Sequence, residues 1–264
     1  MTVSIRASLM LSALAMAGLT AAFVDPPEAE ENAKSGAVAP GHWSYGGEGG
    51  PSHWSDLSPD NKPCAAGMQQ SPVDLATAMP AGIASAQPHW MPAHGGMVVN
   101  NGHTIQIDVA DGGGITLDGK DYVLKQFHFH HPSEHTIDGK QFPLEVHFVH
   151  AAKDGDLAVV GVMFEEGAAN PNLDAIWATA PGREGKAAVA FDIDVAKFLP
   201  AKSQAYRYEG SLTTPPCSET VHWTVMAAPQ TISASQITAF STLFPWNARP
   251  VQPLNRRYVL KTSG

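Results

Sequence analysis

Hydrophobic and polar residues alternate over short stretches of this 264-residue chain, and the apolar runs after Gly41 are too short for long helices. Glycine and proline, 24 and 21 residues in all, interrupt most of these runs. The pattern predicts strands over 104–109, 122–130, 144–151, 158–164, 206–212 and 221–226. Turn signals at 111–114, 118–119 and 154–155 separate several of them. Weaker helical patterns cover 172–179 and 233–243, so the chain is predicted to be mainly β.

The N-terminus has the pattern of a secretory signal peptide. A positively charged start, 1–6, precedes an apolar run over 7–19 and the small residues Thr20, Ala21 and Ala22. We therefore expect a signal peptide over 1–22, and an uncleaved membrane anchor is the alternative. The acidic, Pro- and Ala-rich stretch over 23–40 can bury almost nothing and is predicted to be a flexible linker. The remaining 41–264 is long enough for one domain with a sizeable core.

Charge and cysteine content narrow the class of protein. With 16 basic and 25 acidic residues, the net charge is -9, and the chain lacks the basic field that nucleic acids or anionic lipids require of a partner. In an exported protein, the two cysteines, Cys64 and Cys217, fit a disulfide better than metal ligation. Two free buried thiols are the alternative. The expected location is the periplasm or the extracellular space.

Three histidines have a spacing that suits a metal ion. Side chains alternate along a strand, so His128 and His130 share one face while Phe127 and Phe129 share the other. The two imidazoles are then about 7 Å apart along the chain, and one ion can bridge them. In the predicted strand over 144–151, His147 repeats the alternation, so a neighbouring strand can supply a third ligand.

Such a set is typical of catalytic zinc, because three neutral imidazoles leave a fourth tetrahedral position for water. Copper or cobalt could bind the same set. Gln126 shares the face of His128, and Glu145 shares that of His147, so each can accept a ring's second N–H and fix its tautomer. A chain with 12 histidines can also place two on a strand by chance, and both explanations stay open at this point. Two nearby histidines face away from the set and are predicted to be structural: His131 and His150.

Six further motifs accompany these histidines in order over about 210 residues: 42–46 (HWSYG), 70–73 (QSPV), 100–103 (NNGH), 133–136 (SEHT), 212–216 (LTTPP) and 247–250 (NARP). Together with the strand pair they resemble the alpha carbonic anhydrases, in an exported form of bacterial type. The resemblance implies a large twisted, mostly antiparallel central sheet with short peripheral helices over 41–264. It also implies that Cys64 and Cys217 form the disulfide of exported members.

The resemblance further implies zinc-dependent, reversible hydration of carbon dioxide to bicarbonate and a proton, with His128, His130 and His147 as ligands. In this family Zn²⁺ lowers the pKa of its bound water to about 7, and the hydroxide attacks carbon dioxide. Thr213 would accept the hydroxide's hydrogen bond and donate its own to Glu134, which orients the nucleophile. Without the resemblance, Thr213 is interpreted as a turn residue and Glu134 as a surface charge.

Other positions receive roles from the same resemblance. His103 stands at the proton-shuttle position, where a group that titrates near neutral pH passes the released proton to buffer. Tyr45 and Asn101 match residues that hold the water chain between the shuttle and the metal. His131 and Ala248 stand where many members carry tryptophan, which concerns local packing and no ligand. The positions that match the family's apolar substrate pocket are Val149, Val159, Leu212, Val221 and Trp223.

The implied small-molecule partners are carbon dioxide and bicarbonate, with sulfonamides and anions as inhibitors, and a homodimeric state is left open. Two other functions are weighed against this one. The first is a catalytically silent binding module on the same fold, which usually has lost a metal ligand, whereas all three are retained here. The second is zinc-dependent ester hydrolysis, which an open metal site permits.

Overall fold

The computed structural model describes residues 42–93, 96–202 and 204–263. All of these belong to the unit Ala37–Gly264. The predicted signal peptide (1–22) and acidic linker (23–40) lie outside the described residues. Within the described ranges, no helix has the length and apolar character needed to cross a membrane.

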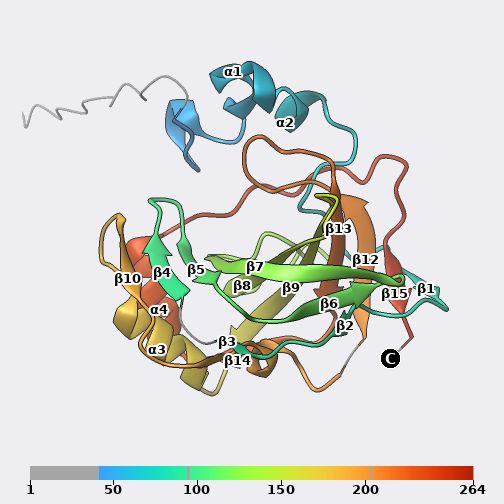
Figure 1. Ribbon diagram of the computed structural model, residues 1–264. Helices are drawn as coiled ribbons and strands as arrows, with labels where there is room; N and C mark the ends of the chain where they lie inside the picture. The colour runs from blue at the N-terminus through green and yellow to red at the C-terminus, as the bar shows by residue number, and fades with distance from the viewer. Residues whose placement is uncertain (1–41, 94–95, 203, 264) are drawn as a thin grey trace, which may run out of the picture. The chain divides into compact units, whose positions relative to one another are not determined.

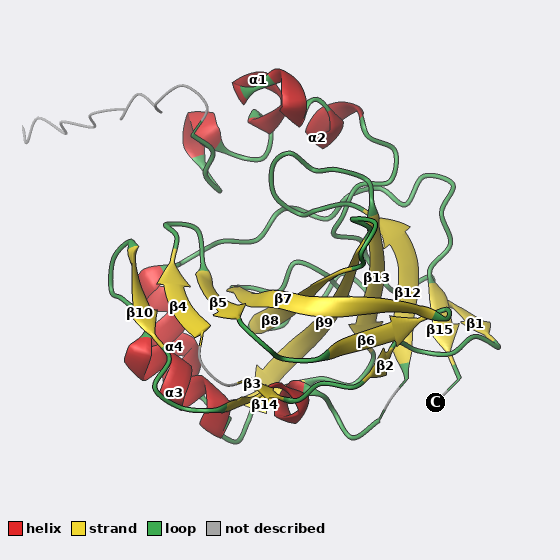
Figure 2. Cartoon of the chain, in the orientation of Figure 1, coloured by secondary structure: helices red, strands yellow, loops and turns green. Residues whose placement is uncertain are grey.

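One large twisted sheet dominates the structure (Figures 1 and 2). Its main path runs in the order β1 (Met79–Ala81), β15 (Leu260–Thr262), β12 (Ala205–Gly210), β13 (Val221–Met226), β9 (Leu157–Glu166), β8 (Leu144–Ala151), β7 (Lys120–His130), β5 (Ile105–Val109), β4 (Gly96–Asn100) and β10 (Gly185–Ala188). Off this path, β6 (Gly114–Leu117) pairs with β7, β2 (Gln87–Pro88) with β6, and β14 (Gln230–Ile232) with β9. A separate pair joins β3 (Pro92–Ala93) to β11 (Ile193–Asp194).

Most neighbouring strands are antiparallel, and the parallel pairs are β1 with β15, β13 with β9 and β14 with β9. The mainly β prediction is confirmed, and each of the six predicted strands is present within a few residues of its expected ends. Shorter strands such as β4, β6 and β10 were not predicted, because Gly- and Ala-rich stretches carry little alternation.

The helices are few and short: α1 (Trp54–Leu57), α2 (Pro63–Ala66), α3 (Pro171–Thr179), α4 (Ala234–Leu243) and 3-10 turns over Gly47–Gly49, Pro59–Asn61 and Val195–Phe198. The two predicted helices, α3 and α4, both begin at side-chain caps. Asn170 accepts a hydrogen bond from the backbone N–H of Asn172, and Ser233 forms a capping box with Gln236. Figure 2 shows both helices at the β4–β10 end of the sheet.

A β-bulge at Lys125 divides β7 into two halves of opposite alternation. Leu124 pairs with His150 and Gln126 with Val149, so Lys125 is one extra residue with no partner on β8. Before the bulge the even-numbered residues Tyr122 and Leu124 enter the same core cluster that Phe127 and Phe129 enter after it. The bulge therefore turns the even-numbered His128 and His130 to the opposite face. The sequence prediction treated 122–130 as one regular strand and missed this change.

The sheet separates two apolar clusters. On the face of Phe127 and Phe129, a large cluster contains residues of β7, β8 and β9 together with Leu173 of α3 and Phe240 of α4. We call it the phenylalanine core. On the opposite face, a smaller cluster gathers around Trp223 and contains residues of β9, β12 and β13. We call it the tryptophan core, and His128, His130 and His147 face this side.

Distant segments of the chain are joined beside the tryptophan core. Cys64 and Cys217 form a disulfide, as predicted, and pack with Trp54. The guanidinium of Arg249, a residue only 2% exposed, donates to the carbonyls of Cys64 and Ser71. It also lies 5.4 Å from the ring centroid of Trp54. These contacts join segments that lie far apart in the sequence.

Replacing Phe198 should test the phenylalanine core. Its ring is fully buried and lies 5.7 Å from the rings of both Phe127 and Phe148. We expect Phe198→Ala to lower the free energy of unfolding by about 3–5 kcal/mol through lost burial and a cavity. Tyr258→Ala, at a side chain that is 70% exposed, is the control and should change it little. Denaturant unfolding measures both, and equal small effects would contradict this assignment of the core.

Candidate metal centre

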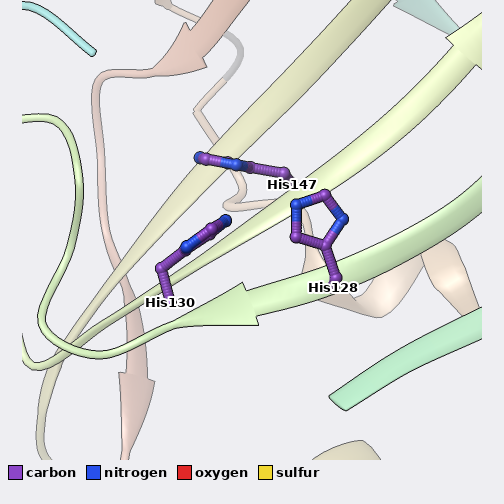
Figure 3. Close-up of side chains that lie close together, drawn as sticks. All are labelled: His128, His130 and His147. Atoms are coloured by element: carbon purple, nitrogen blue, oxygen red, sulfur yellow. The ribbon is translucent and has the colours of Figure 1, made fainter. Parts of the chain in front are cut away.

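Three histidine rings meet on the tryptophan side of β7 and β8. His128 lies directly opposite His147 in the antiparallel ladder, and His130 is two residues further along β7. The ring centroids are 5.0 Å apart for His128 and His130, 5.5 Å for His128 and His147, and 4.6 Å for His130 and His147. One nitrogen from each ring lies within 4.8 Å of the other two, and Figure 3 shows the rings turned toward one another.

Each ring also has an acceptor for its other nitrogen. His128 Nδ1 lies 2.8 Å from Gln126 Oε1, and His147 Nε2 lies 2.9 Å from Glu145 Oε1, as the alternation predicted. His130 Nδ1 lies 2.8 Å from the backbone carbonyl of Asn247, a partner that no local pattern could indicate. Because a carbonyl or carboxylate oxygen can only accept, these outer nitrogens carry the protons. The inner nitrogens, Nε2 of His128, Nε2 of His130 and Nδ1 of His147, are then free to bind a cation.

Burial keeps these rings neutral. It lowers the pKa of His130 from 6.5 to about 4, and it also lowers the pKa values of His128 and His147. The Nε2 atom of His130 is buried and has no hydrogen-bond partner among the described residues. An unpaired buried nitrogen is costly, and a metal ion would remove that cost. Three neutral imidazoles thus fit a metal with one open position.

A second group of potential ligands is already satisfied by hydrogen bonds. His135, Glu145 and His147 also bring ligand atoms within 4.8 Å of one another. However, Glu145 Oε1 lies 2.7 Å from His135 Nδ1, and Glu145 Oε2 accepts from the backbone N–H groups of Glu134 and His135 at 2.9 Å. His135 Nε2 lies 2.7 Å from the Tyr208 hydroxyl. This group therefore holds His147 from behind the three-histidine cluster.

A buried carboxylate lies beside the three rings. Glu134 Oε1 accepts from the backbone N–H of Arg249 at 2.9 Å, and Oε2 lies 3.8 Å from His147 Nδ1. Burial raises the pKa of the Glu134 carboxyl to about 7, against the opposing effects of His147, of the Arg249 N–H and of the Thr213 hydroxyl. Glu134 and Thr213 therefore lie together beside the three histidines. The pKa of Tyr45 is raised by burial and by the charge of Glu134, so Tyr45 lies within electrostatic range of that carboxyl.

The five predicted pocket residues also come together. Val159, Val221 and Trp223 are buried in the tryptophan core, and Val149 and Leu212 pack against it. The ring of Trp223 lies 4.8 Å from that of His147 in an edge-to-face arrangement. An apolar wall therefore stands directly beside the histidine cluster.

His103 lies on the loop between β4 and β5, where its ring stacks on Trp43 at a centroid distance of 3.7 Å. The ring of His42 lies 5.5 Å away on the same surface. Burial, and then the charge of His42, lower the pKa of His103, while Glu184 opposes them. Asn101, which is exposed, accepts from the backbone N–H groups of His103 and Thr104 through Oδ1 and so shapes this loop.

Several supporting residues escaped the sequence analysis. His135, Tyr208 and Ser71 form a buried hydrogen-bonded chain behind Glu145, and the Tyr208 hydroxyl donates to Ser71 Oγ at 2.9 Å. His135 and Ser71 stand in quoted motifs, but no spacing rule assigns them a partner 73 or 137 residues away. His131 and His150 lie outside the cluster, and their Nδ1 atoms face the backbone carbonyls of Pro143 and Ala158.

Comparison with known proteins agrees with this geometry. The family model for eukaryotic-type carbonic anhydrase matches residues 49–263. The chain belongs to the alpha carbonic anhydrase family. It is 46% identical over 223 residues to a carbonic anhydrase of Pectobacterium carotovorum, covering 83% of this chain and 90% of the relative.

Solved structures of the family share the fold. The alpha carbonic anhydrase of Thermovibrio ammonificans, solved in complex with the inhibitor sulfanilamide, is 46% identical with a TM-score of 0.80, covering 83% of this chain and 98% of that one. Dioscorin complexed with ascorbate is 31% identical with a TM-score of 0.77, covering 83% and 97%. The chain is therefore a member of an enzyme family. The same fold also occurs in dioscorin, whose name is not that of a carbonic anhydrase.

Glu145→Gln should weaken metal binding. The change removes the charge behind His147 and sets an amide against the backbone N–H groups of Glu134 and His135. We expect a loss of about 10- to 100-fold in Zn²⁺ affinity, the usual effect of losing such a partner. Competition with a chromophoric chelator measures it, and Glu165→Gln, at an exposed position on β9, is the matched control. Unchanged affinity in the Glu145 variant would contradict this role.

Proposed function

We propose that this chain catalyses the reversible hydration of carbon dioxide with Zn²⁺ held by His128, His130 and His147. The observation that carries the proposal is the set of three buried, neutral imidazoles, each with its outer nitrogen paired and its inner nitrogen free. Bound there, zinc would lower the pKa of a coordinated water to about 7 and so supply a nucleophile at neutral pH.

The protein's own residues would orient that nucleophile. The pKa-lowering effect of the Thr213 hydroxyl places it beside the carboxyl of Glu134, whose buried Oε2 has no hydrogen-bond partner among the described residues. In the active site the hydroxyl would donate to this carboxylate. Because the one hydroxyl proton of Thr213 would then be used in the hydrogen bond to Glu134, the Thr213 oxygen could only accept a hydrogen bond from another group. The attacking water must then direct its hydrogen to Thr213 and a lone pair toward the substrate, which removes unproductive orientations.

Carbon dioxide would lie against the apolar wall formed by Val149, Val159, Leu212, Val221 and Trp223. Carbon dioxide is small and uncharged and needs no strong hydrogen bond, so the burial of apolar surface is enough to hold it. Addition of water gives bicarbonate and one proton. The product is charged and leaves the apolar wall for solvent.

His103 would take the proton to solvent. Its ring is half-buried at the surface, and burial lowers its pKa, so that it releases a proton to buffer readily. Tyr45 near Glu134 and Asn101 beside His103 would hold the water chain between them. These assignments follow from the positions of the side chains and from the family.

Sulfonamides and small anions are the expected inhibitors, since the Thermovibrio enzyme was solved with sulfanilamide. The disulfide between Cys64 and Cys217 supports a location in the periplasm or outside the cell. The three intact histidines favour an enzyme over a silent binding module on the same fold. Ester hydrolysis is the secondary activity to compare with hydration.

Metal removal tests the proposal. We expect stopped-flow hydration of carbon dioxide to fall to the uncatalysed background after treatment with a strong chelator and to return with added Zn²⁺. His130→Ala should abolish activity that Zn²⁺ does not restore, whereas His89→Ala, at an exposed histidine, should behave as wild type. Hydration that survives both chelation and His130→Ala would refute the proposal.

His103→Ala tests the shuttle. Turnover should fall by about tenfold or more in weak buffer, because general acid–base transfer is lost, while kcat/KM for hydration changes little. Added imidazole should restore kcat by carrying the proton in place of the side chain. If imidazole has no effect, the proton leaves by another route.

A further inference from the structure

The side chain of Asn247 uses all of its hydrogen-bonding groups to join two parts of the site. It is only 1% exposed and lies in the loop that follows α4. Oδ1 accepts from the backbone N–H of His131 at 2.6 Å. Nδ2 donates to the carbonyl of Phe129 at 2.9 Å and to the carbonyl of His103 at 2.9 Å. One amide therefore holds both the end of β7 and the backbone of His103.

The loop of His103 is held otherwise by local contacts and by the stacking of the His103 ring on Trp43. The side chains of Asn100 and Asn101 accept from backbone N–H groups within the loop, Asn100 also donates to the carbonyl of Pro181, and Gly102 has a positive φ of 84°. Thr104, the residue after His103, is bonded to the backbone of Phe129. Its hydroxyl donates to the Phe129 carbonyl and accepts from the Phe129 N–H. Among the described residues, Asn247 is the side chain that donates a hydrogen bond to the His103 carbonyl.

We propose that Asn247 is a positioning residue that fixes the distance between His103 and the metal centre. The inference rests on the proposed function, in which His103 carries the proton. Proton transfer through water depends steeply on geometry, and a misplacement of about 1 Å can cost about 100-fold in rate. An uncharged amide does not titrate in the working pH range, so this anchor holds over the whole cycle in which His103 gains and loses a proton.

The structure also provides room for His103 to move if the anchor is lost. A cavity of about 420 Å³ lies beside the loop, and its lining includes His42, His103, Trp246 and Asn247. Imidazole can enter the same open space. Loss of the anchor should therefore be repairable by an external proton carrier.

Asn247→Ala separates positioning of the shuttle from support of the metal. The backbone carbonyl that holds His130 Nδ1 remains in any substitution. We expect kcat in weak buffer to fall by about tenfold and by more than kcat/KM, and added imidazole to restore kcat. Asn172→Ala is the control, since it removes one side-chain hydrogen bond to the carbonyl of Asp194. A parallel fall in kcat and kcat/KM that imidazole does not reverse would overturn the proposal.

A double-mutant cycle tests whether Asn247 acts through His103. If it does, Asn247→Ala should cause no further loss of kcat in a His103→Ala background. Additive losses would overturn the proposal. If the alanine variant fails to fold, Asn247→Asp keeps the volume and the acceptor for His131 and should give the same pattern. A normal kcat in weak buffer for His103→Ala would instead refute the shuttle itself, which distinguishes failure of the proposed function from failure of this inference.

Discussion

The arrangement of the site depends on one extra residue in β7. Because Lys125 has no partner on β8, the alternation of β7 shifts at this point. Phe127 and Phe129 therefore join the even-numbered Tyr122 and Leu124 in the phenylalanine core, and the even-numbered His128 and His130 face the opposite side. The same register places His128 opposite His147. Two neighbouring strands thus fix three ligands with little freedom, while the phenylalanine core holds the strands from behind.

Around this strand pair, hydrogen bonds decide the chemical state of each ring. Gln126, Glu145 and the carbonyl of Asn247 each take one N–H, which leaves the lone pairs of His128, His130 and His147 facing inward. Glu145 is itself saturated by His135 and by two backbone N–H groups. The result is a preorganised centre in which burial lowers the pKa values of the rings and keeps them neutral.

The sequence predicted the parts of the site that follow from local periodicity. Strand alternation found the three histidines, Gln126 and Glu145, and the caps of α3 and α4 lie where the helical patterns begin. The roles of Glu134, Thr213 and His103 came from resemblance, because a turn residue and a surface histidine carry no local signal. The bulge at Lys125 and the contacts of Asn247 and Ser71 could not be foreseen. They depend on strand register or on partners more than 100 residues away.

The contacts of Asn247 and Arg249 also set an order for assembly. The ligand strands lie close together in the sequence, but the carbonyl that holds His130 and the N–H that holds Glu134 come from residues 117 and 115 positions later. During synthesis the chain therefore completes β7 and β8 well before the groups that complete the site exist. The centre reaches its final form only when nearly the whole chain has emerged, so a molecule truncated before residue 247 would retain the ligands and lack the finished site.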